Sequence, residues 1–139
     1  MTNQILKPTH PHLLPDLLQH HTAGLDADRS DYRAAIDRLI DNLVSIEDTP
    51  GEFLLRLEDG RVIDTKGWHG FEWTQGVGLY GMYKHWELTG DPKAWDIMIK
   101  WFEDRFKEGM PSRNINTVAP FLTLAYLYER TGNRMYLPY

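Results

Sequence analysis

A turn motif occurs twice in this chain, 42 residues apart, as Thr89-Gly90-Asp91 and Thr131-Gly132-Asn133. Each copy follows an apolar segment and precedes a further segment with helical spacing of apolar residues. A repeated unit of buried helix, turn and half-exposed helix is typical of an α/α toroid or a helical solenoid. The residues before and after the turns also align at this offset: Met82 with Leu124, Trp86 with Tyr128, and Trp95 with Leu137.

A toroid must close, because otherwise its apolar inner helices stay bare. Six such hairpins need about 250 residues or more, whereas this chain has 139. We therefore expect an all-α fold that is the N-terminal portion, about two and a half hairpins, of an (α/α)6 barrel. We expect an arm over residues 1–29 and an incomplete toroid domain over residues 30–139. Such a chain should expose an apolar face, so the remainder of the barrel or a self-association partner is expected to cover it.

Apolar spacing and capping residues predict four helices in residues 30–139. The helix ranges are about 31–46 with Ser30 as N-cap, 74–88, 92–108 and 117–130, and another helix is expected to begin at Arg134. The last of the four is apolar nearly all round, which predicts a buried helix. Asp59-Gly60 between apolar runs predicts a short hairpin within residues 52–66.

Composition excludes several classes of protein. A net charge of -5 gives no electrostatic basis for binding nucleic acid, and the absence of Cys excludes disulfides and thiolate metal sites. We also predict no membrane partner, since no apolar run is long enough to span a bilayer. The N-terminus lacks the apolar region of a secretory signal, which predicts a cytoplasmic protein.

The first 29 residues contain four of the six histidines and three prolines. No His or carboxylate recurs there at helical ligand spacing, so we interpret this segment as a polar arm, with no metal site and no cofactor. Leu13-Leu14 and Leu17-Leu18 are compatible with a short helix in it. The histidines are His10, His12, His20 and His21.

The stretch from Gly67 to Gly81 combines two Trp, a His, a Glu, a Gln and several Gly just before and within a predicted helix. Aromatic rings and polar groups at a helix N-terminus are typical of a carbohydrate site. In the repeat, the loop before the 117–130 helix lies on the same side of the ring. The candidate substrate-binding residues are Trp68, Trp73, Gln75, Asn114, Asn116 and Thr117.

Purely structural roles are also open for several of these residues. Trp73 can equally be a packing residue, and Asn116 can be a helix cap. We interpret Glu72 as a structural carboxylate and His69 as a loop or core histidine rather than as catalysts. Glycoside hydrolysis usually needs two facing carboxylates, and no convincing pair is present, so the residues alone favour a binding surface over a complete active site.

Three motifs in order resemble the N-terminal part of glycoside hydrolase family 105, the unsaturated rhamnogalacturonyl and glucuronyl hydrolases. They are EWTQGVGLYG at 72–81, ELTGD at 87–91 and NINTVAP at 114–120. The resemblance runs from about residue 32 to the end of the chain, and residues 1–29 lie outside it.

The resemblance implies an (α/α)6 barrel that removes the unsaturated uronyl residue from lyase-generated oligosaccharides. In this family an Asp protonates the C4=C5 enol ether, water adds at C5, and the hemiketal opens and expels the remaining sugar. Trp73 corresponds to an aromatic residue of the uronyl subsite, and Asn116 stands where some relatives have a second acidic residue, which implies binding or support. The family's principal Asp lies in a downstream Trp-rich segment, so the catalytic residue is expected beyond Tyr139. The alternative is a non-catalytic helical-repeat module that binds protein or carbohydrate.

Overall fold

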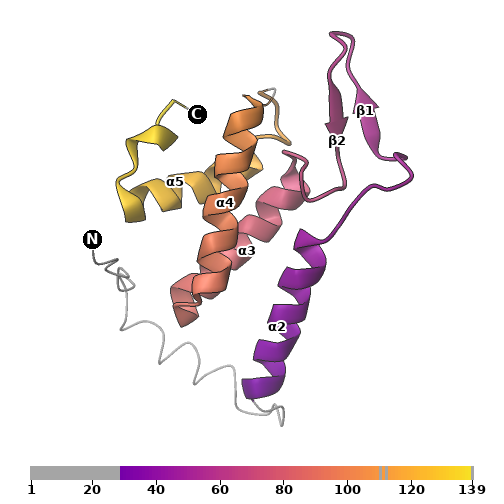
Figure 1. Cartoon of the computed structure of the whole chain (residues 1–139). Helices are drawn as coiled ribbons and strands as arrows, with labels where there is room; N and C mark the ends of the chain where they lie inside the picture. Colours follow the sequence, from indigo (N-terminus) through magenta and orange to yellow (C-terminus); the bar gives the residue numbers. More distant parts are fainter. Residues whose placement is uncertain (1–28, 110, 112, 139) are drawn as a thin grey trace.

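The computed structural model describes residues 29–109, 111 and 113–138, and Figure 1 shows them as packed helices with a projecting hairpin. The predicted short helix at 13–18 and nearly all of the proposed arm lie outside the described residues. The elements in order are α2 (Arg29–Val44), β1 (Leu54–Arg56), β2 (Val62–Asp64), α3 (Trp73–Thr89), α4 (Pro92–Glu108), α5 (Ala119–Thr131) and the 3-10 turn η1 (Arg134–Tyr136).

The predicted helices and hairpin are present, with small differences at their ends. Ser30 lies inside α2 rather than capping it, because the helix begins at Arg29. The helix expected from Arg134 is a single 3-10 turn in the described chain. The hairpin pairs Leu55 with Ile63 in an antiparallel register, and Gly60 adopts the positive φ of 85° that its turn requires.

The repeated turn motif is confirmed, and its two copies form the same hydrogen bonds. Gly90 and Gly132 both end a helix in the left-handed conformation, with φ of 72° and 63°. Thr89 and Thr131 each donate a side-chain hydrogen bond to the carbonyl four residues earlier, at 2.7 Å. Asp91 then accepts from the backbone N–H of Lys93, as Asn133 does from that of Met135. The two turns are therefore built by the same capping chemistry.

The core forms where α3 packs against both α4 and α5. Gly76 of α3 lies so close to the start of α5 that an added Cβ would be 2.7 Å from Pro120 N. The small residue Gly76 in α3 therefore allows the close approach of α5. The fully or nearly fully buried side chains of this core include Leu79, Met82, Tyr83, Met98, Phe102 and Leu127.

An ion-pair network also joins α3 to α5. Arg130 donates to the Tyr83 hydroxyl at 3.0 Å and to Glu87 at 2.8 Å, and Lys84 donates to Glu87 at 2.7 Å. Burial alone would raise the pKa of Glu87, but the hydrogen bonds and charges of Lys84 and Arg130 together lower it.

Helix α2 is less fully covered than its apolar stripe predicted. Ile40 is buried, whereas Leu39 is 67% exposed and Tyr32 is also exposed. Between α2 and α3 runs an apolar groove whose lining includes Ile36, Leu39 and Gly78.

The prediction that the 117–130 helix is buried all round is wrong for the described residues. Helix α5 buries Thr123, Leu124 and Leu127 on the side facing α3, but Leu122 and Ala125 on its other side are exposed. The reason is geometric, because helices of the described chain pack against one side of α5 only. Among the residues the structure describes, no helix combines the length and apolarity needed to cross a lipid bilayer.

Candidate functional site

The loops that precede α3 and α5 lie side by side, as the repeat predicted. The carboxylate of Glu72, at the end of the first loop, accepts a hydrogen bond from the side chain of Asn116 in the second. The rings of Phe71 and Phe121 are 5.4 Å apart at their centroids. The N-terminal ends of the two helices therefore form one continuous surface, which we call the rim.

Side chains from α3 and α4 hold the first loop through its backbone carbonyl groups. Gln75 Nε2 donates to Gly67 O at 2.6 Å, and Trp101 Nε1 donates to Trp68 O at 2.8 Å. The guanidinium of Arg105 donates to the carbonyl of His69, the next residue in the loop. The carbonyl groups of three consecutive residues are thus hydrogen-bonded, which fixes the backbone conformation of the loop.

This arrangement determines where two of the predicted binding residues lie. Gln75 is 1% exposed, its amide nitrogen is used by the loop, and its amide oxygen accepts from Thr74. Trp68 is buried, with its ring 5.9 Å from that of Trp101. Both side chains shape the rim from within, which favours a supporting role over direct contact with a ligand.

The second loop is a hydrogen-bonded turn built on Asn114. Its Oδ1 accepts from the backbone N–H groups of Asn116 at 2.8 Å and Thr117 at 3.2 Å. Thr117 is buried, and its hydroxyl donates to the carbonyl of Asn114 at 3.1 Å. These bonds hold the turn before α5, and no side chain caps α5 itself, whose N-cap is Val118. The capping interpretation of Asn116 is therefore not supported in the described chain, and Asn116 is exposed with its side chain directed to Glu72.

Trp73 is the aromatic residue that the rim presents to solvent. It is the first residue of α3 and is 54% exposed, although it is large and apolar. The packing interpretation of Trp73 is thus not supported in the described chain. An exposed indole beside polar groups at a helix N-terminus suits a ligand with both apolar faces and hydroxyl or carboxylate groups.

Glu72, the residue before Trp73, is buried. Burial raises the pKa of its carboxyl, and the hydrogen bonds from the Asn116 side chain and the Trp73 backbone N–H offset only part of that effect. The carboxyl therefore holds a proton more readily than an exposed glutamate. Its role as a support for Asn116 agrees with the interpretation of Glu72 as a structural carboxylate.

Sequence reasoning missed the contributions of α4 to the rim. Trp101 and Arg105 lie 33 and 36 residues after the loop carbonyls they bind. In the sequence, Trp101 is one of several apolar residues at helical spacing, and no local pattern distinguishes Arg105. Arg105 is buried and paired with Glu108 at 2.8 Å, and only its burial in the folded chain reveals its role.

Comparison with known proteins gives concordant results. The model of Glycosyl Hydrolase Family 88 matches residues 45–139. An unsaturated rhamnogalacturonyl hydrolase of Bacillus subtilis is 30% identical over 67 residues, which is 48% of this chain and 20% of that protein.

Two solved structures described as possible members of the GH105 family are also similar. The one from Salmonella enterica is 57% identical with a TM-score of 0.79, and the match covers 83% of this chain and 30% of that one. The one from Klebsiella pneumoniae is 49% identical with a TM-score of 0.80, and the match covers 99% of this chain and 35% of that one.

The chain thus spans about a third or less of the length of these relatives. Their likeness confirms both the helical-barrel fold class and the resemblance to glycoside hydrolase family 105. The family model covers well over half of the chain. The chain therefore belongs to Glycosyl Hydrolase Family 88, as a segment with the fold of the GH105 structures.

Proposed function

We propose that this chain is part of a glycoside hydrolase that removes the unsaturated uronyl residue from lyase-generated oligosaccharides. The observation that carries the proposal is the exposed ring of Trp73 beside the hydrogen-bonded pair of Glu72 and Asn116. The likeness to an unsaturated rhamnogalacturonyl hydrolase supports the same class of substrate.

The rim offers a complementary group for each part of such a sugar. The indole of Trp73 provides a flat apolar surface for a pyranose ring. The N-terminal ends of α3 and α5 carry the positive end of each helix dipole, which favours an anion, here the uronate carboxylate. Asn116, oriented by Glu72, contributes an exposed amide that can bind a hydroxyl group.

The proposed reaction is hydration of the C4=C5 enol ether. Protonation of the double bond lets water add at C5, and the resulting hemiketal opens and releases the rest of the oligosaccharide. In this scheme Trp73 and Asn116 bind and orient the uronyl ring. The principal proton donor stays a prediction for a residue beyond Tyr139.

We also propose that residues 30–139 form an incomplete toroid domain and that further helices cover its apolar surface. Support comes from exposed side chains of α3, of α5 and of the residue before α5: Val77, Val118 and Leu122. Exposed apolar residues in this number on two neighbouring helices are typical of a surface that another element buries.

The test follows the ultraviolet absorbance of the conjugated uronate when the full-length protein is incubated with lyase-generated oligosaccharides from pectin and from glycosaminoglycans. We expect the absorbance to fall with at least one of these substrates, and to fall more slowly with Trp73→Ala. The matched control is Leu88→Ala, because Leu88 is 52% exposed at the other end of the same helix. Binding with unchanged absorbance for every substrate would instead indicate a carbohydrate-binding module.

A further inference from the structure

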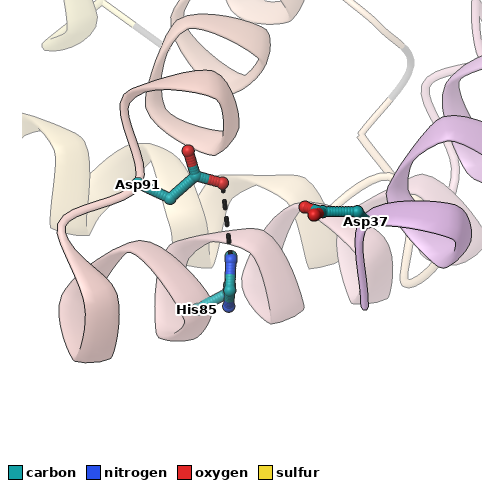
Figure 2. Close-up of side chains that lie close together, drawn as sticks. All are labelled: Asp37, His85 and Asp91. Carbon is teal, nitrogen blue, oxygen red and sulfur yellow. Dashed lines mark ion pairs between the residues drawn. The ribbon is translucent and has the colours of Figure 1, made fainter. Parts of the chain in front are cut away.

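A second cluster of polar side chains lies at the other end of α3, far from the rim. His85 on α3, Asp91 at the start of α4 and Asp37 on α2 direct their side chains toward one another (Figure 2). One ligand atom from each lies within 4.8 Å of the other two. Residue 37 of α2 and the α3–α4 connection at 85–91, which are distant in sequence, therefore converge on one point.

We propose that Asp37, His85 and Asp91 bind a divalent transition-metal ion of the zinc class, which fastens α2 to the turn between α3 and α4. This site is independent of the proposed hydrolase function. His85 follows Trp73 by twelve helical residues, which separates the cluster from the rim by about 18 Å. Three protein ligands leave the fourth tetrahedral position to water, unlike the closed four-ligand sites typical of structural zinc, so the ion would fasten α2 through an open site.

The distances suit such an ion. Bonds of about 2.0–2.2 Å to zinc place tetrahedral ligand atoms about 3.4 Å apart. His85 Nε2 and Asp91 Oδ2 are 3.4 Å apart. One carboxylate oxygen of the partly exposed Asp37 lies within 4.8 Å of both atoms, so its side chain would have to move closer when an ion binds.

The cap of α4 does not use the Asp91 oxygen that faces His85. Asp91 uses Oδ1 to cap α4 through the N–H of Lys93, which leaves Oδ2 facing His85. Lys93 itself is engaged by Asp41 at 2.6 Å. An imidazole with two carboxylates selects zinc and its neighbours in the first transition series over magnesium or calcium, which prefer oxygen ligands alone.

The charge around the cluster does not oppose a cation. The surrounding surface carries the carboxylates of Asp37, Asp41 and Asp91 and the cations of Arg33 and Lys93. With His85 neutral, as a metal ligand must be, this gives a formal charge of about -1 before the ion binds.

Helix α2 has few buried apolar contacts with α3, so an ion that bridges the two would stabilise its docking. Leu39 and Tyr32 on α2 are exposed, and apolar contact with α3 depends mainly on Ile36, Ile40 and Leu43. An ion that bridges α2 to α3 and α4 binds only the docked arrangement. It therefore raises the stability of that arrangement in proportion to its affinity.

The experiment must separate this site from the four histidines of residues 1–28, which can bind zinc themselves. We replace His10, His12, His20 and His21 with Gln in the full chain and use that protein as the background. After treatment with EDTA and dialysis, it is titrated with ZnCl2 by isothermal calorimetry. The melting temperature is measured with and without zinc, and helix content is checked by circular dichroism.

We expect one zinc equivalent in the background protein and a higher melting temperature with zinc. Asp37→Asn and His85→Gln should each weaken zinc binding by about tenfold or more and abolish the rise in melting temperature. The matched control Asp96→Asn removes an exposed carboxylate of α4 that lies outside the cluster, and it should keep both effects. If His85→Gln fails to fold, Asp37→Asn decides the result, because its side chain is partly exposed.

Cobalt provides a second readout. Co2+ in a four-coordinate site should give intense visible absorbance in the background protein and in Asp96→Asn, but not in Asp37→Asn. The proposal is overturned if the background protein binds no zinc. It is equally overturned if Asp37→Asn binds zinc as tightly as Asp96→Asn and gains the same rise in melting temperature.

Discussion

The close packing of α3 on α5 can be tested with one substitution made at two positions of the same helix. Gly76 and Gly81 both lie within α3. A Cβ added at Gly76 would be 2.7 Å from the carbonyl carbon of Ala119 and from Pro120 N, which are backbone atoms. A Cβ added at Gly81 would meet nothing within 4 Å. The two variants Gly76→Ala and Gly81→Ala therefore differ in their surroundings and in little else.

The expected magnitudes follow from two opposing effects. Replacing Gly with Ala in a helix interior stabilises it by about 0.5–1 kcal/mol. Overpacking a close contact costs about 1–3 kcal/mol, and the upper part of that range applies where backbone must move rather than a flexible side chain. We therefore expect Gly81→Ala to be more stable than wild type by up to about 1 kcal/mol, and Gly76→Ala to be less stable by about 1–2 kcal/mol.

The assay is urea unfolding followed by circular dichroism, with the free energy extrapolated to water. The difference between the variants cancels the helix propensity, so it measures the steric cost alone. A Gly76→Ala protein as stable as Gly81→Ala would refute the close approach of α3 and α5 at this point.

Three further predictions concern buried polar groups. Burial raises the pKa of the Glu72 carboxyl. Its ionisation therefore lowers the free energy of unfolding above that raised pKa and has no effect below the ordinary value of 4.5. In urea unfolding, Glu72→Gln should be more stable than wild type at pH 7 and equal to it near pH 4. The pKa of Glu87 is lowered, so its contribution to the free energy of unfolding is present above the ordinary value of 4.5 and is lost as the pH falls through the lowered pKa. Glu87→Gln should therefore lower the free energy of unfolding by about 1–3 kcal/mol at pH 7. An equal loss at pH 2 would contradict this. Trp101→Phe leaves the carbonyl of Trp68 without its indole donor. We therefore expect thermal unfolding to show a free energy of unfolding lower by about 1–3 kcal/mol. An unchanged melting temperature would show that this bond does not hold the loop.

Local signals in the sequence were sufficient for most of the fold. Asp91, followed by Pro92, marked the start of α4, and Gly90 and Gly132 marked helix ends, because capping depends on a few neighbouring residues. The spacing of the repeat also placed the loops before α3 and α5 on one side. These features are encoded within a turn or two of chain, so a single sequence reveals them.

The sequence was less informative wherever a long-range contact decides the role of a residue. Trp68 and Trp73 are both tryptophans of one motif, yet the first is buried against Trp101 and the second is exposed. The cluster of Asp37, His85 and Asp91 is drawn from three elements and has no ligand spacing along the chain. The expectation of no metal site rested on the histidines of the arm, and this cluster gives the reason to test that expectation.

The central claim is that the rim binds an unsaturated uronyl sugar through Trp73. The most direct measurement is isothermal calorimetry of the full-length protein with an unsaturated uronyl disaccharide, comparing wild type, Trp73→Ala and Leu88→Ala. The account predicts that wild type and Leu88→Ala bind with similar affinity, and that Trp73→Ala loses about tenfold or more, as expected when the aromatic contact of a binding site is removed. Equal affinity in all three proteins, or no binding by wild type, would contradict it.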